Sequence, residues 1–215
     1  MRRAWAAALA GVVIAGIAGL LVTAATDERD LAFTLGVQPA QVAAVLNPGQ
    51  EACQQPIYAS DNAADVRFKA GTYGRPGPPL EVKAIHIGAS RATSVSAGYP
   101  DNSFVTAPLD GVRKGGVVGV CIRNAGKQRL ALYGGAPQAA RTSAAFVDGK
   151  NVNTDLTLVF ERAHSRSTLS ALPDIFQRAA LWHPGWVGVW TFWVLLVLVL
   201  IGVPLLLWRA LATSE

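Results

Sequence analysis

The clearest structural pattern in the chain lies in residues 64–87, ADVRFKAGTYGRPGPPLEVKAIHI. Val66 and Phe68 alternate with charged residues, and this period of two is typical of a strand with one buried face. The residues from Gly74 to Pro79 are rich in glycine and proline, which favour turns. We therefore predict a strand, a loop and a second strand.

The second strand of this pattern begins at Leu80. Val82 continues its apolar face, and Ile85 and Ile87 resume the alternation after an apparent slip of one residue at Ala84. A one-residue slip moves the following side chains to the other face of a sheet.

Short apolar or alternating segments recur on both sides of residues 64–87. They are 32–37, 42–46, 103–109, 117–123, 129–133, 143–147 and 156–162, separated by turns such as Asn124-Ala125-Gly126 and Asp148-Gly149-Lys150. Many short strands with glycine and proline turns are typical of a sandwich or barrel. No strand alternates with a full-length helical pattern, which argues against a nucleotide-binding α/β fold. We expect a mainly β protein, with a jelly-roll or carbohydrate-binding-module-like β-sandwich over residues 26–162.

Cys53 and Cys121, the only cysteines, both fall in this domain. If the domain is exported, a disulfide can form and persist there, and we predict that the two pair. Two buried free thiols are the alternative. A metal site is disfavoured, because two cysteines without a neighbouring histidine or acid cannot complete a coordination shell.

The N-terminal end is strongly apolar. Residues 4–25 carry no charge, follow Arg2 and Arg3, and precede an acidic cluster. The run exceeds the roughly 7 to 15 residues of a signal-peptide core and reaches the ~20 needed to span a bilayer. An uncleaved transmembrane anchor is favoured, with residues 1–3 cytoplasmic. A cleaved signal peptide stays open, because small residues precede residue 26.

The C-terminal end contains a second uncharged run, and residues 184–208 are predicted to form a transmembrane helix. Tryptophans crowd its entry, and Trp208 with Arg209 marks its exit, so residues 209–215 should be a cytoplasmic tail. Trp186, Trp190 and Trp193 also recur at helical spacing, which fits either an interfacial aromatic belt or a face for a partner helix.

Residues 163–183 are predicted to be a linker and an amphipathic helix. Apolar residues from Leu169 to Trp182 recur at helical spacing, and Ser170 before Pro173 suits a cap and first turn. We expect this helix to lie on the outer membrane surface, with packing against the sandwich as the alternative.

The whole chain is 51% hydrophobic and 15% charged, with a net charge of +5. Most of the apolar excess lies in the two terminal runs, and the segment between them has ordinary polarity. Its charges are dispersed, which argues against nucleic-acid binding and against a polybasic lipid patch. No acid, lysine or histidine lies inside either apolar run, so an intramembrane proton path has no groups to use.

Catalytic motifs are missing from the sequence. His86, His164 and His183 show no metal-ligand spacing, and no nucleophile elbow, zinc-protease motif or phosphate-binding loop is present. Asp101 and Asp110 are the candidate carboxylate pair for a glycosidase-like site, which requires that the fold bring them together. We expect no enzyme activity, no cofactor and no metal.

A binding site fits the composition better, because sugar-binding β-sandwiches present tyrosine or tryptophan faces and polar side chains from loops. The candidate ligand-binding residues all lie in or beside predicted loops: Tyr73, Arg75, Tyr99, Asp101, Asn102, Asn124 and Tyr133. Each also has a structural interpretation, the tyrosines as half-buried strand-end residues and the Asp-Asn pair as a turn former.

Four segments carry a resemblance to a known group: VLNPGQEACQQPIY, VRFKAGTYGRPGPPLEV, VCIRNAGKQRLALYGG and ALPDIFQRAALWHPGWVGVWTFW. In these the chain resembles uncharacterised actinobacterial envelope proteins that hold one exported β domain between two membrane spans. The resemblance implies that architecture and an association with membrane glycosyltransferases in cell-envelope assembly.

We therefore expect a non-catalytic membrane protein whose extracytoplasmic domain binds a glycan or a membrane partner. Its expected partners are the lipid bilayer and an envelope polysaccharide or membrane glycosyltransferase, and not nucleic acid. A scaffold or sensor subunit without sugar binding is the alternative, and an exported hydrolase is the third hypothesis.

Overall fold

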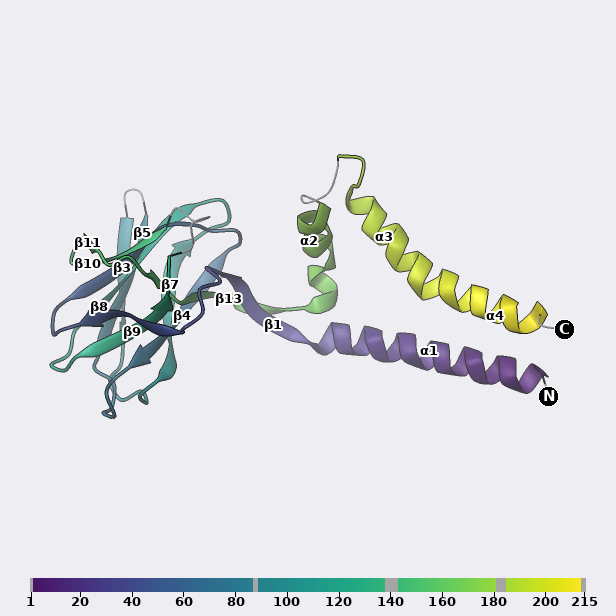
Figure 1. Ribbon diagram of the computed structural model, residues 1–215, viewed down its shortest axis with the longest axis horizontal. Coiled ribbons are helices and arrows are strands. Elements are labelled where there is room, and N and C mark those ends of the chain that lie inside the picture. Colours follow the sequence, from purple (N-terminus) through teal and green to yellow (C-terminus); the bar gives the residue numbers. More distant parts are fainter. Residues whose placement is uncertain (1, 87–88, 138–142, 181–184, 214–215) are drawn as a thin grey trace. The chain divides into compact units, whose positions relative to one another are not determined.

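A computed structural model describes residues 2–86, 89–137, 143–180 and 185–213 (Figure 1). Two compact units divide the chain. One consists of residues 30–164, and the other combines residues 1–29 with residues 165–215. The predictions made for Ile87, Trp182 and His183 lie outside the described residues.

The first unit is mainly β and contains two sheets whose described strand pairs are all antiparallel. The seven-stranded sheet has the order β1 (Glu28–Thr34), β13 (Leu158–Ser167), β4 (Ala63–Gly71), β9 (Leu130–Gly135) and β12 (Asp155–Leu156). Two further strands join it, β2 (Gln41–Leu46) beside β9 and β7 (Ser103–Val112) beside β4.

The six-stranded sheet has the order β11 (Lys150–Asn151), β10 (Ala144–Val147), β3 (Glu51–Tyr58), β8 (Val117–Asn124), β5 (Leu80–His86) and β6 (Ala89–Val95). The turn between β10 and β11 has Asp148 and Gly149 at positive φ, 48° and 77°. This is the aspartate-glycine pairing that a two-residue hairpin favours.

A single apolar core fills this unit. Val66 and Phe68 of β4 are buried, as the alternation predicted, and Phe160 of β13 is fully buried and stacks on Phe33 with ring centroids 4.3 Å apart. Burying a side chain of this size contributes about 1.5–3 kcal/mol to folding. The sandwich-like, mainly β class is therefore confirmed.

The predicted slip in β5 is wrong. Leu80, Val82 and Ala84 are all buried on one face, and Ile85 lies opposite Gly119 on the other. Alanine is small enough to complete the buried face, so the strand stays regular.

The predicted disulfide is present. Cys53 of β3 and Cys121 of β8 lie directly opposite each other, with Cα atoms 4.0 Å apart, and their sulfurs are bonded. Glu51 approaches both sulfurs, but a disulfide offers no thiolate to a metal ion, so this group carries no metal site.

The second unit contains the terminal helices. Helix α1 covers Arg2–Thr26. Within it, the stretch Gly11–Thr26 is apolar but shorter than a membrane-spanning helix. Helix α2 covers Thr168–Ala180. It begins earlier than predicted, because the hydroxyl of Ser167, and not Ser170, caps it by accepting a hydrogen bond from the Ser170 amide at 3.3 Å.

A continuous helix ends the described chain, formed by α3 (Val189–Val197), the π-turn η1 (Leu198–Gly202) and α4 (Val203–Thr213). Within it, Val189–Ala210 is long and apolar enough to cross a membrane, at about 33 Å for ~1.5 Å per residue. The π-turn ends two residues before Pro204, whose missing amide hydrogen interrupts the regular helical bonding.

The aromatic face at the start of this helix differs from the prediction. Trp186 precedes the helix in a turn, so it does not share a helical face with Trp190 and Trp193. Phe176 of α2 packs edge-on against Trp193 with centroids 5.0 Å apart, and stacks with Phe192 at 5.6 Å. Part of the predicted partner face is therefore covered by α2.

Candidate functional site

Three loops of the β unit meet at one end of the strands. They are the β4–β5 loop (72–79), the β6–β7 loop (96–102) and the β8–β9 loop (125–129). The Gly77 amide donates to the Tyr99 carbonyl at 2.8 Å, and the Ala125 amide donates to the Pro79 carbonyl at 3.1 Å. The sequence separates these loops widely, and the sheets bring them together.

Asp101 holds the β4–β5 loop in place. Its carboxylate accepts hydrogen bonds from the backbone amides of Thr72, Gly74 (2.7 Å) and Asn102 (2.9 Å). The bond from Thr72, followed by the bond from Gly74, lowers the pKa of Asp101 below its usual range. The charged carboxylate therefore fixes the loop conformation through its backbone.

Tyr73 lies between two of these bonded amides in a strained conformation. Its φ is 57°, in the left-handed region that a tyrosine rarely adopts. The residue is nevertheless 59% exposed, so burial does not explain the conformation. Strain of this kind persists where the surroundings over-determine it, often at binding sites.

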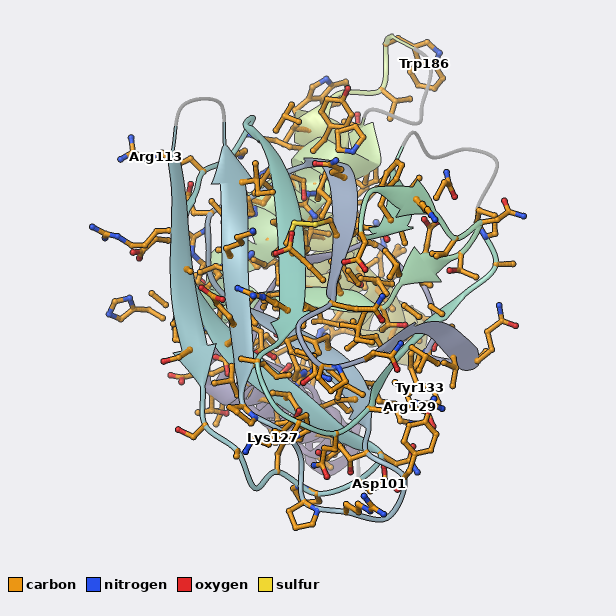
Figure 2. All side chains as sticks on the ribbon, turned by 90° about the vertical axis from the view of Figure 1, so that its left-hand side faces the viewer. Asp101, Arg113, Lys127, Arg129, Tyr133 and Trp186 are labelled. Atoms are coloured by element: carbon orange, nitrogen blue, oxygen red, sulfur yellow. A yellow bond between two sulfur atoms is a disulfide. The ribbon has the colours of Figure 1, made fainter. Side chains whose placement is uncertain are left out.

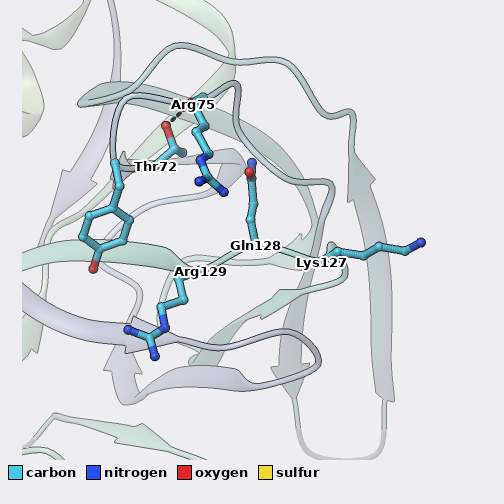
Figure 3. Close-up of a pocket in the computed structure, with 6 residues that line it drawn as sticks. Thr72, Arg75, Lys127, Gln128 and Arg129 are labelled. Atoms are coloured by element: carbon cyan, nitrogen blue, oxygen red, sulfur yellow. Dashed lines mark hydrogen bonds between the residues drawn. The ribbon is translucent and has the colours of Figure 1, made fainter.

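A pocket of about 450 Å³ opens beside Tyr73, and its other lining residues are Thr72, Arg75, Lys127, Gln128 and Arg129. Figure 3 shows Arg75 and Gln128 lying toward each other from two loops, whereas Lys127 extends away. A second hollow of about 660 Å³ shares Arg75, Lys127 and Gln128 and continues along the proline-rich part of the β4–β5 loop. The two hollows adjoin and provide room for more than one small ring.

Two predicted ligand-binding residues line this pocket, Tyr73 and Arg75. Asn102 and Tyr133 are not in its lining but contact each other: the Tyr133 hydroxyl donates to Asn102 Oδ1 at 2.5 Å, and Lys69 Nζ lies 4.8 Å from the Tyr133 ring centroid. Figure 2 shows Tyr133 at the same end of the unit as Arg129 and Asp101.

Tyr99 and Asn124 lie in the supports of the loops and not in the lining. A Cβ on Gly77 would come within 2.1 Å of the Tyr99 ring, so this ring packs directly on the glycine. Burial raises the pKa of the Tyr99 hydroxyl. Asn124 is fully buried and donates to the carbonyls of Leu46 (3.1 Å) and Gln128 (2.7 Å).

Sequence reasoning missed four lining residues: Thr72, Lys127, Gln128 and Arg129. Residues 127–129 directly follow a predicted turn, and two of the three are cationic. A search for charged residues at loop ends would have found Lys127 and Arg129, because loops carry binding residues more often than strands do; the uncharged Thr72 and Gln128 give no such signal.

The carboxylates considered for catalysis do not come together. Asp101 precedes β7 and Asp110 lies near the far end of that strand, so at ~3.3 Å per residue they are more than about 20 Å apart. Asp110 instead pairs with Arg91 at 2.8 Å. His164 is exposed on β13, and the side chains of His86 and His183 are outside the described part of the structure.

No model of a known protein family matches this chain, and no curated protein matches it in sequence.

Proposed function

We propose that the chain is a non-catalytic, membrane-anchored protein whose β domain binds a glycan at the pocket beside Tyr73. In this proposal the domain is of the jelly-roll or carbohydrate-binding-module type and lies outside the cytoplasmic membrane, with both termini inside. The disulfide supports this location, because disulfides persist in oxidising compartments. We propose that the protein is accessory to membrane glycosyltransferases in the cell-envelope assembly of an actinobacterium.

The observation that carries the proposal is the exposed Tyr73 ring, held in a strained backbone beside planar polar side chains. An aromatic face packs against the C–H face of a pyranose ring, while arginine and glutamine hydrogen-bond to its hydroxyls. A shallow open pocket with these groups needs no reactive residue to bind a sugar.

Replacing Tyr73 with alanine should weaken glycan binding roughly tenfold, because an aromatic anchor in a binding site commonly contributes more than 1 kcal/mol. The measurement is affinity electrophoresis or a glycan array with the full chain in detergent. Tyr58→Ala is the matched control, since Tyr58 is 66% exposed on the same domain but does not line the pocket.

Equal binding by both variants would contradict the proposed site. A scaffold or sensor subunit is the second candidate function, favoured by Trp186 and Trp190, which are 76% and 62% exposed. It would replace the glycan proposal if a membrane protein co-purified with the full chain while no glycan bound.

Membrane anchoring at both ends gives a separate expectation. The full chain should stay in the membrane pellet after alkaline extraction, because the helix Val189–Ala210 presents an apolar surface up to Trp208 and carries its one charge, Arg209, at the end. A variant that ends at Gly188 should also stay in the pellet if α1 is an uncleaved anchor. Release of that shorter variant would show that α1 does not hold the protein in the membrane.

A further inference from the structure

We propose that the glycan bound at this pocket is anionic and carries carboxylate or phosphate groups. This inference rests on the proposed glycan binding and adds the chemical class of the ligand. Its basis is the charge of the pocket lining: Arg75, Lys127 and Arg129 are cationic, and none of the six lining residues is acidic.

The lining cations differ from five of the nine other lysines and arginines described in the β unit. Arg67, Lys83, Arg91, Arg123 and Arg162 each lie within 4 Å of a carboxylate oxygen. The other four, Lys69, Arg113, Lys114 and Lys150, also have no carboxylate partner among the described residues. Arg75, Lys127 and Arg129 have no such acidic partner among the described residues, although a net charge of only about +3 lies on the whole segment between the apolar ends. Cations that line one hollow without a carboxylate partner give it a positive potential that favours an anion, although the Lys127 side chain extends away from it.

The two arginines suit a planar or tetrahedral anion. Arg75 lines the pocket from the β4–β5 loop, and Figure 3 shows it extending toward Gln128. Arg129 lines it from the β8–β9 loop, and its side chain extends away from Arg75. A guanidinium can give two parallel hydrogen bonds to one carboxylate or phosphate group. The Asp101 carboxylate does not compete for them, because backbone amides already occupy it.

The adjoining hollow favours a chain of sugars over a lone anion. Arg75, Lys127 and Gln128 belong to both hollows, so one ligand can contact cations in each. The exposed Tyr73 ring gives a stacking face that an isolated phosphate or carboxylate would not use. These features together favour a polysaccharide with repeated negative charges.

The test uses two matched pairs of ligands with the full chain in detergent: oligogalacturonate against its methyl ester, and dextran phosphate against dextran. At least one charged ligand should bind roughly tenfold or more tightly than its neutral partner, because charge-assisted hydrogen bonds are about twice as strong as neutral ones. Affinity for it should also fall as salt is added.

The variants Arg75→Gln and Arg129→Gln should each weaken binding of the charged ligand about tenfold and leave the fold unchanged, since both side chains are exposed. Arg113→Gln is the matched control. It removes the same charge from an exposed arginine that Figure 2 shows far from Arg129 and Lys127. Its affinity should equal that of the unaltered chain.

Four results would overturn the inference, and they separate it from the glycan proposal. If charged and neutral ligands bind equally and Tyr73→Ala weakens both, the pocket binds glycans but does not select anions. If neither pair binds, both proposals fail. If Arg113→Gln is as harmful as Arg129→Gln, only the overall charge matters. If glycerol phosphate binds as tightly as dextran phosphate, the site recognises the anion without the sugar.

Discussion

Replacing both Cys53 and Cys121 with alanine should lower the free energy of unfolding of the β unit by roughly 4 kcal/mol. The bridge joins residues separated by 68 positions, and in the chain-entropy account closing a loop of that length restricts the unfolded chain by about this amount. The folded state should change little, because β3 and β8 remain paired through their backbones on both sides of the bridge.

Denaturant unfolding of the full chain in detergent, followed by near-ultraviolet circular dichroism of the tyrosines, measures this change. All four tyrosines lie in the β unit and all six tryptophans lie outside it, so the tyrosine band reports on the correct unit. Adding a reductant should destabilise the unaltered protein and leave the double variant unaffected. An unchanged midpoint in the double variant would contradict the prediction.

Strands with one buried apolar face could be predicted from the sequence, and strands with another composition could not. β4 and β7 show alternation because every second residue packs in the core. β3 is obscured because Gln54 occupies a buried position. Its side chain donates to Asp155 Oδ1 at 2.8 Å and accepts from the Leu156 amide at 2.9 Å. A buried polar residue satisfied in this way looks like a surface residue in sequence.

β6 was missed for a different reason. It lies at the edge of its sheet and consists of small and polar residues with one large apolar residue, Val95, at its end. Edge strands need little apolar surface, and polar residues protect them from pairing with other chains.

The candidate site could be predicted only in part. Tyr73 and Arg75 share one loop and were found together, whereas Arg129 belongs to a loop that only the sheet topology brings near. Tyr99 looked like a binding residue because it lies beside Asp101 and Asn102. Its ring instead packs on Gly77, and no local pattern reveals a contact between residues so far apart in the sequence.

A charge pair inside the β unit gives the second large effect. Replacing Arg162 with methionine should lower the free energy of unfolding by about 3 kcal/mol, since breaking a buried ion pair from one side costs roughly 3–5 kcal/mol. Arg162 donates to Asp61 Oδ2 through Nη2 at 2.7 Å and through Nε at 3.2 Å, and it also donates to the Leu31 carbonyl. One side chain thus connects β13, β1 and the β3–β4 loop.

Arg91→Met is the control for this prediction, because Arg91 and Asp110 also pair at 2.8 Å but are 79% and 61% exposed at their side chains. An exposed pair contributes only about 0–1 kcal/mol, so this variant should unfold almost as the unaltered protein does. The side chains of Arg162 and Asp61 are only 18% and 11% exposed, and methionine leaves that carboxylate enclosed without the guanidinium. If both variants lose the same small amount of stability, the Arg162–Asp61 pair behaves as a surface pair and burial does not strengthen its role.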